Sequence, residues 1–191
     1  EFGKHGKDNV TVEMLLTHQA GLAYLDEDVT EEEAADPQAI SRRLEDQRPL
    51  WSPGRASGYH IYTFGWLADQ LVRRVDPAGR SIGRFVKEEL HDAFNVDFYI
   101  GLPDNVMGRV ARLRAPSLID RLSEMVAEPK LAALAIHAFQ LLDPSSMLSR
   151  ALHNLPFLEC IHQMTVNNPD YWRIEQAAAL GIGNARSLAQ I

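Results

Sequence analysis

Cysteine is almost absent from this 191-residue sequence, and that absence limits the kinds of site it can build. The single cysteine, Cys160, cannot form a disulfide within the chain, and it leaves no cluster of thiolates for a zinc site. The cysteine content therefore neither requires nor forbids an oxidising compartment. Localisation cannot be inferred from it.

Long apolar runs are also missing, so no membrane span is predicted. The longest run, LAALAIHAFQLL, is interrupted by His137 and Gln140 and is shorter than the roughly 20 residues that cross a bilayer. The first residues, EFGKHGKDN, include neither an initiator Met nor the apolar core of a signal peptide, and the last segment, ARSLAQI, has no helix C-cap. We therefore expect residues 1–191 to be an internal part of a single longer domain.

Positive charge is in deficit, which argues against a nucleic-acid partner. The formal net charge is -7, whereas affinity for phosphate backbones is built mainly from clustered Lys and Arg. One group of basic residues does occur, and we interpret it as a solvated helix face: Arg73, Arg74, Arg80, Arg84 and Lys87.

Motifs for metals, cofactors and one common type of hydrolase are missing as well. The seven histidines form no HExxH pattern, so no metal is predicted. The pair Gly181 and Gly183 lacks the third glycine of a dinucleotide loop, and a helix capped by Asn184 explains it better. Ser57 lacks the glycine two positions before it that the strained elbow of α/β-hydrolases needs. We predict no cofactor.

The patterns that are present predict a mostly helical chain with a few short strands. Hydrophobic side chains make up 46% of the residues, enough for one sizeable core. Apolar spacing predicts helices over 12–19, 37–48, 63–74 and 81–94, strands over 96–103 and 109–114, and further helices over 117–128, 130–142 and 144–154. Residues 167–180 are expected to return the chain to the main body.

The helix ends are predicted from capping residues. Thr11 can cap a first helix that carries a stripe of Val12, Leu15 and Leu16 and stops at Gly21. His18 falls in its last turn, where a protonated imidazole would stabilise the helix dipole, so we favour a structural role for it. The acidic run 26–36 fits a solvated loop or short helix. Asp36-Pro37 starts the next helix, with Ile40 and Leu44 facing inward and four charged residues, Arg42, Arg43, Glu45 and Asp46, facing outward. Ser81 caps the helix over 81–94, which is expected to pack beside the helix from Thr63.

The stretch WSPGRASGYHIYTFGW, residues 51–66, joins a loop rich in Gly and Pro to an amphipathic helix. Tyr59 and His60 fall at that junction. Loops on a rigid scaffold commonly carry catalytic residues, although an isolated Tyr more often serves in packing.

A family resemblance favours a catalytic role for Tyr59 over a role in packing alone. VTVEMLLTHQAGL, followed by WSPG, GYHIYTFGWLADQLVRR and SIGRFVKEEL, resembles the serine β-lactamase-like and penicillin-binding-protein superfamily, with class C β-lactamases and family VIII carboxylesterases most similar. The resemblance covers residues 1–103 and resumes at AAALGIGNARSLAQI. It implies that the complete protein has an α/β fold, an antiparallel sheet flanked by helices. The Ser-x-x-Lys segment would lie upstream of this chain and the last strands downstream.

By this resemblance, Tyr59 corresponds to the tyrosine of the second catalytic motif, and its spacing to Gly65 fits the family pattern better than that of Tyr62 does. A phenol beside a lysine ammonium can shuttle protons between serine, lysine and leaving group. His60 is a second candidate, as a polar substrate-binding group at the mouth of the site.

Two departures from the family pattern bear on function. Ile61 occupies the position of the motif Asn, which makes lactam hydrolysis less favoured than ester hydrolysis. No serine of the chain is followed by lysine three positions later, and the arginines of the nearest matches, Arg55 and Arg84, cannot act as the base. We predict part of a serine hydrolase acting on a small-molecule ester or amide through an acyl-enzyme. The alternative is a non-catalytic member that serves as a scaffold or assembly module.

Overall fold

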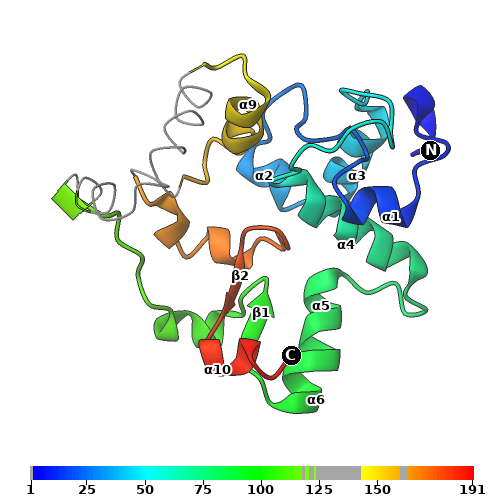
Figure 1. Cartoon of the computed structure of the whole chain (residues 1–191). Coiled ribbons are helices and arrows are strands. Elements are labelled where there is room, and N and C mark those ends of the chain that lie inside the picture. Colours follow the sequence, from blue (N-terminus) through cyan, green and yellow to red (C-terminus); the bar gives the residue numbers. More distant parts are fainter. Residues whose placement is uncertain (1, 118, 121–122, 124–142, 160–162) are drawn as a thin grey trace.

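The computed structural model describes residues 2–117, 119–120, 123, 143–159 and 163–191. The described part is rich in helix and includes a two-stranded antiparallel sheet, as predicted (Figure 1). The α-helices are α1 Val12–Leu16, α2 Glu31–Ala34, α3 Pro37–Asp46, α4 Thr63–Val75, α5 Ile82–Val86, α6 Asp92–Phe94, α9 Met147–His153 and α10 Ala185–Leu188. A π-helical turn, Lys87–His91, joins α5 to α6, and 3-10 turns cover Lys4–Gly6, Asp104–Arg109, Thr165–Asn167 and Tyr171–Arg173. The strands are β1 Phe98–Ile100 and β2 Gly181–Gly183.

The predicted helix starts are confirmed. Thr11, Asp36, Ser81 and Asn184 each accept a hydrogen bond from a backbone N–H in the first turn of the helix that follows. Such a cap satisfies one of the N–H groups that have no partner inside a helix. The acidic run 26–36 contains α2, which begins with a capping box between Thr30 and Glu33.

The first helix is shorter than predicted and its apolar stripe is not buried. α1 ends at Leu16, and the first left-handed residue after it is His18, with φ 60°, rather than Gly21. Leu15 is buried, but Val12 and Leu16 are about half exposed. Five residues give little more than one turn, so α1 can direct one apolar side chain into the core and not three.

α3 buries one side chain that we expected to face solvent. Ile40 and Leu44 are buried as predicted, but Glu45 is buried too. Its carboxylate accepts a hydrogen bond from the Ser41 hydroxyl and pairs with Arg74 of α4. Its backbone carbonyl accepts from the buried ammonium of Lys7. The N-terminal turn and α4 therefore cover a face that the helical pattern alone marks as polar.

The main hydrophobic core lies between α3, α4 and segments that return from the far end of the chain. Ile40, Leu44 and Trp66 pack there with Leu155 and Ile174, which confirms that the segment 167–180 rejoins the main body. Asn154, directly after α9, is 3% exposed, and its side-chain amide accepts from the backbone N–H of Leu25 and donates to its carbonyl. The core thus joins residues about 130 positions apart.

α4 approaches the returning segment closely at Gly65. A Cβ atom at this position would overlap the Gln176 side-chain oxygen and lie 2.5 Å from the backbone nitrogen of Ala178. Gln176 is fully buried and donates a hydrogen bond to the carbonyl of Tyr62, the residue before α4. Glycine is therefore required for the segment to reach the start of the helix.

The sheet and its neighbours form the other side of the molecule. β1 and β2 pair antiparallel, with Phe98 opposite Gly183 and Ile100 opposite Gly181. Gly181 and Gly183, which we assigned to a helix start, thus also form a strand.

The strand predicted over 109–114 is wrong. Residues 110–117 have no regular structure, and the backbone N–H and carbonyl of Leu113 bond to the side chain of Asn167 instead of to a strand.

The predicted helix over 144–154 is confirmed by α9, whereas those over 117–128 and 130–142 lie largely outside the described residues. No helix in the described ranges is long and apolar enough to cross a bilayer.

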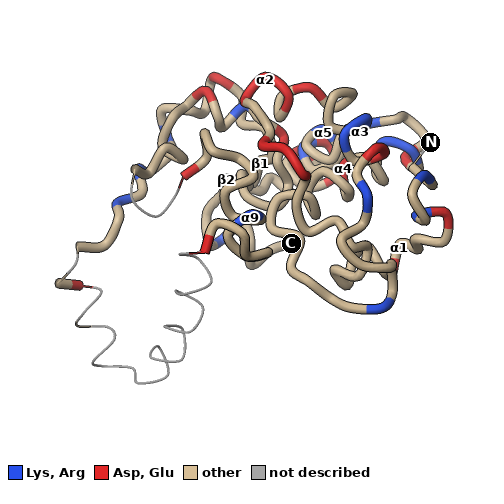
Figure 2. The backbone as a smooth tube through the Cα atoms, turned by 90° about the horizontal axis from the view of Figure 1, so that it is seen from above, with Lys and Arg blue, Asp and Glu red and all other residues tan. Residues whose placement is uncertain are grey.

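The group of basic residues between Arg73 and Lys87 is not simply a solvated helix face. Each of its five members pairs with a carboxylate, and the side chains of Arg73 and Arg80 are largely buried. Figure 2 shows the two signs of charge interspersed along the backbone.

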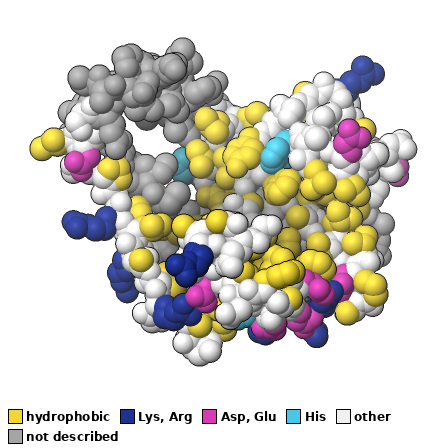
Figure 3. Space-filling view, turned by 60° about the horizontal axis from the view of Figure 1, so that its bottom comes forward, with side chains coloured by type: hydrophobic (Ala, Val, Ile, Leu, Met, Phe, Trp, Pro, Cys, Tyr) yellow, Lys and Arg dark blue, Asp and Glu magenta, His cyan; other side chains and the backbone are white. Residues whose placement is uncertain are grey.

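The face drawn in Figure 3 has hydrophobic side chains gathered over its centre. Contiguous apolar surface of this kind is typical of regions that contact other protein segments or ligands.

The approach at Gly65 predicts a large effect of one methyl group. Gly65→Ala is expected to lower the free energy of unfolding by roughly 1–3 kcal/mol, because the returning segment must move away from α4. Gly108→Ala is the matched control, since a Cβ there meets nothing within 4 Å. Urea unfolding measures both variants. Equal stability of the two would contradict the close approach.

Candidate active site

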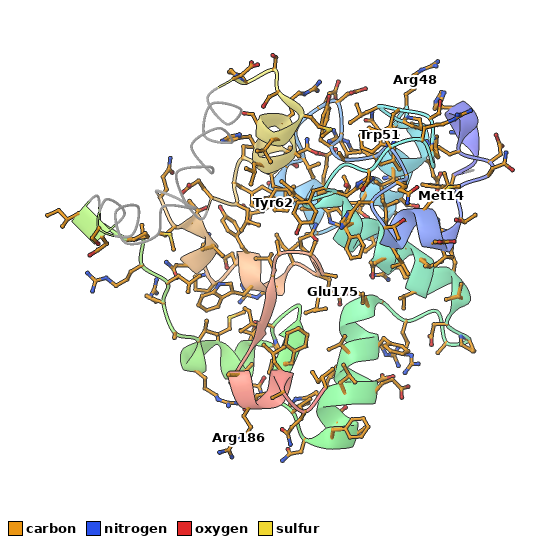
Figure 4. All side chains as sticks on the ribbon, in the orientation of Figure 1. Met14, Arg48, Trp51, Tyr62, Glu175 and Arg186 are labelled. Atoms are coloured by element: carbon orange, nitrogen blue, oxygen red, sulfur yellow. The ribbon has the colours of Figure 1, made fainter. Side chains whose placement is uncertain are left out.

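Tyr59 lies on an irregular loop, residues 51–62, that leads into α4. The predicted loop-to-helix junction is therefore confirmed. The Tyr59 side chain is 65% exposed, whereas its neighbours Gly58 and His60 are buried. Trp51 and Tyr62, at the two ends of the loop, are labelled in Figure 4. The loop presents one phenol to solvent between two anchored residues.

The loop is held by hydrogen bonds to the segment that follows α1. Gly54 N–H donates to the Gln19 carbonyl (3.0 Å), Gly58 N–H to the His18 carbonyl (3.1 Å), and the Thr63 hydroxyl to the Leu22 carbonyl (2.5 Å). In the opposite direction, Leu22 N–H donates to the His60 ring. Residues 20–25 are all buried, so they give the loop a rigid support.

His60 is an interior residue, 1% exposed. Its Nε2 accepts from the Leu22 N–H at 3.0 Å, which leaves the ring proton on Nδ1, where it donates to the Gly58 carbonyl at 2.6 Å. Removal from water lowers the pKa of His60 from 6.5 to about 4. The ring is neutral at pH 7, and both nitrogens are engaged with the backbone rather than directed at a substrate.

His18 lies beside Tyr59, a position that sequence analysis did not give it. Its ring centroid is 4.9 Å from that of Tyr59, in an edge-to-face arrangement, and 5.0 Å from that of Phe64. Its Nδ1 accepts from the His60 N–H at 3.2 Å. Burial lowers the pKa of His18. The predicted protonated cap on the dipole of α1 is therefore wrong, because the ring acts as a hydrogen-bond acceptor and points to the loop.

The sequence carries one indication that His18 has a special role, which is that no glycine directly follows α1. A chain that leaves a helix in the left-handed conformation usually does so at Gly or Asn, and another residue there costs about 1–2 kcal/mol. His18 and Gly58 lie in two segments that both carry the family resemblance. Their contact could not be deduced from spacing alone.

Trp51 and Ile61 form the inner side of the loop. Both pack against a small cluster of Ala23, Tyr24 and Ala151, and Ile61 also packs against the main core. A Cβ on Gly58 would lie 2.6 Å from the Trp51 ring and 3.3 Å from the Met147 side chain of α9. The bend before Tyr59 therefore depends on a glycine under an indole ring.

The lysines in the described part of the chain are engaged away from Tyr59. Lys7 donates to the carbonyls of Glu45 and Gln47, while Lys4 and Lys87 pair with Asp46 and Asp92. The described residues include no group of three or more His, Cys, Asp or Glu placed to hold a metal ion. A cavity of about 490 Å³ lies next to β2 and the turn Asp104–Arg109, and neither Tyr59 nor His60 lines it.

The chain belongs to the Beta-lactamase family, whose sequence pattern it matches over residues 1–191. It is 29% identical over its whole length to the esterase/beta-lactamase LipL of Mycobacterium tuberculosis, and it covers 41% of that protein. It is similar in structure to EstA of Arthrobacter nitroguajacolicus, with a TM-score of 0.74, 25% identity and coverage of 100% of this chain and 45% of EstA.

A family VIII carboxylesterase is also similar, with a TM-score of 0.73, 28% identity and coverage of 100% of this chain and 44% of that enzyme. The matched length is thus less than half of each of these three relatives. The family assignment and the helix-rich portion of its fold are as the resemblance predicted.

The buried neutral imidazole predicts a pH-dependent stability. Between pH 6.5 and about 4 the unfolded chain holds a proton on His60 that the folded chain does not, so the free energy of unfolding falls as the pH is lowered. The loss attributable to this residue is on the order of 3 kcal/mol. Urea unfolding from neutral pH down to about pH 4.5 measures it.

Two variants isolate the residue. His60→Gln, although less stable at pH 7, is expected to have a flatter profile than the wild type over that range. His5→Gln, a change at an exposed histidine, is expected to keep the wild-type slope. Parallel profiles for all three proteins would show that His60 is not the neutral buried group.

Proposed function

We propose that the complete protein is a serine hydrolase that cleaves a small-molecule ester through an acyl-enzyme, with Tyr59 transferring protons at the site. The observation that carries the proposal is the exposed phenol of Tyr59, held on a loop whose flanking residues are anchored in the interior. A proton-transfer group must be accessible to the reacting atoms and must also be held in one geometry. This loop meets both requirements.

In the proposed reaction, a serine oxygen supplied by a segment outside residues 1–191 attacks the ester carbonyl. Tyr59, as phenolate beside a lysine ammonium from the same segment, accepts the serine proton and passes it to the departing alkoxide. Water then attacks the acyl-serine and loses a proton to Tyr59. As the bond between the acyl group and the serine oxygen breaks, Tyr59 returns that proton to the serine oxygen and the acid is released. Protons and electron pairs balance over the cycle, and the protein returns to its starting state.

The relatives include enzymes named for ester hydrolysis, and Ile61 favours an ester over a lactam. LipL is described as an esterase/beta-lactamase, and one structural relative is a family VIII carboxylesterase. Ile61, at the position of the motif Asn, has no hydrogen-bonding group for a lactam amide and packs into both apolar clusters. We further propose that His60 contributes to substrate binding indirectly, by fixing the loop, because its ring nitrogens are engaged with Leu22 and Gly58.

The second candidate function is a non-catalytic scaffold of the same fold. Ile61 favours it, because this residue replaces the polar Asn of the family motif. A covalent probe of the nucleophile separates the two candidates.

The 191-residue chain is expected to hydrolyse p-nitrophenyl esters no faster than buffer, because it has no serine paired with a lysine base. The protein expressed from its complete gene is expected to react with a fluorophosphonate at one serine outside this chain, identified by peptide mass spectrometry. A scaffold would not be labelled. Labelling of a serine within residues 1–191 would contradict the proposed location of the nucleophile.

Tyr59→Phe removes the phenolic oxygen and keeps the ring. In the protein from the complete gene it is expected to lower kcat for an ester by about 100-fold or more, the range of a lost proton-transfer group. Tyr171→Phe is the control, because it removes the same hydroxyl from a ring that packs on Phe157. Steady-state kinetics with p-nitrophenyl butyrate measures both variants. Full activity of Tyr59→Phe would refute the role of Tyr59.

A further inference from the structure

His18 binds the backbone N–H groups of both residues that flank Tyr59. Its carbonyl accepts from the N–H of Gly58, the residue before Tyr59, at 3.1 Å. Its imidazole Nδ1 accepts from the N–H of His60, the residue after Tyr59, at 3.2 Å. One residue thus supplies two acceptors, on either side of the exposed phenol.

The ring of His18 also contacts the Tyr59 side chain itself. The two rings meet edge to face at 4.9 Å with an interplanar angle of 66°, an arrangement that aromatic pairs prefer. Phe64 of α4 lies against the same imidazole at 5.0 Å. His18 therefore lies between the first turn of α4 and Tyr59, and it limits the directions that the phenol can take.

The backbone of His18 is the second unusual feature. It is left-handed, with φ 60°, a conformation that glycine adopts without strain and histidine does not. Glycine there would keep the carbonyl that Gly58 uses, but it would lose the contacts made by the ring. A strained residue at a candidate site is a reason to look for a function of its side chain.

We propose that His18 is a positioning residue for Tyr59: its imidazole fixes the loop through His60 and orients the phenol through ring contact. The inference rests on the proposed function of Tyr59 for its catalytic consequence. With Nδ1 accepting from His60, the neutral ring has its proton on Nε2. In this arrangement Nδ1 is occupied by the backbone, and in the proposal His18 acts through Tyr59.

Two substitutions separate the ring from the backbone. His18→Gly removes the imidazole and suits the left-handed conformation, so the protein is expected to stay folded. His18→Asn also tolerates that conformation and places an oxygen where Nδ1 accepts from His60, but it lacks the ring. His5→Gly is the matched control, because His5 is likewise left-handed and is exposed in the turn Lys4–Gly6.

The kinetic test uses the protein from the complete gene and a p-nitrophenyl ester. His18→Gly is expected to lower kcat by roughly 10- to 100-fold with little change in KM, the size of effect that misplacement of a reacting group can produce. His18→Asn is expected to lie between His18→Gly and the wild type, and His5→Gly to match the wild type. A stable His18→Gly variant with wild-type kcat would overturn the proposal.

The decisive measurement is a double-mutant cycle with Tyr59→Phe. If His18 acts through the phenol, His18→Gly has little further effect once that phenol is gone, so the two changes are not additive. A merely structural role for His18 predicts the same loss in both backgrounds. Additive effects would overturn the positioning role and leave the proposed function of Tyr59 intact.

A readout independent of activity covers the case in which Tyr59→Phe proves fully active and the proposed function fails. Tyrosine ring resonances of the labelled protein are recorded by NMR, with Tyr59 assigned by its loss in Tyr59→Phe. His18→Gly is expected to shift the Tyr59 resonance, and His5→Gly to leave it in place. An unchanged Tyr59 resonance in His18→Gly would overturn the positioning contact whatever the activity shows.

Discussion

Hydrogen bonds run in both directions between residues 18–22 and the loop 51–62, and the candidate site depends on them. His60 is central to it, because its imidazole accepts from Leu22 and donates to Gly58 while almost fully removed from water. A buried polar ring is costly unless each nitrogen has a partner, and here the two partners belong to the two segments that must be joined. The cost of burying the ring without partners thus favours the loop conformation in which both of these hydrogen bonds form.

The same constraint explains why the support comes from distant parts of the sequence. The loop rests on residues 20–25, and those are held in turn by Asn154 after α9 and by Arg150, whose guanidinium lies over the Tyr24 ring and bonds its hydroxyl. Gln176 holds the carbonyl of Tyr62 at the other end of the loop. Residues 150–154 and Gln176, which lie far along the chain from the loop 51–62, therefore fix its geometry and give a rigid base to an exposed side chain.

A feature of the fold or the site could be predicted from the sequence when its contacts join residues close together in the chain. Caps at Thr11, Asp36 and Ser81 were predictable because each bond joins residues two or three positions apart. The buried Glu45, the edge-to-face contact of His18 with Tyr59 and the approach of Gln176 to Gly65 were not, because each joins segments that periodicity does not relate. The strand expected over 109–114 failed for the same reason, since the Asn167 side chain takes the place of a partner strand. Tyr59 became a candidate through family resemblance, and its exposure between two buried neighbours is what the structure adds.

Ile61 connects stability with the substrate preference that we propose. The family resemblance aligns it with a motif position where a polar group would meet a lactam amide, yet its side chain packs against both hydrophobic clusters and so helps to hold α9 and the loop together. An amide at this position would either remain buried without all its partners or turn outward and leave apolar neighbours unfilled, and either outcome costs stability. The packing at Ile61 and the proposed preference for esters therefore have one physical origin. A change of specificity at this residue would also require its apolar neighbours on α9 and in residues 23–24 to repack.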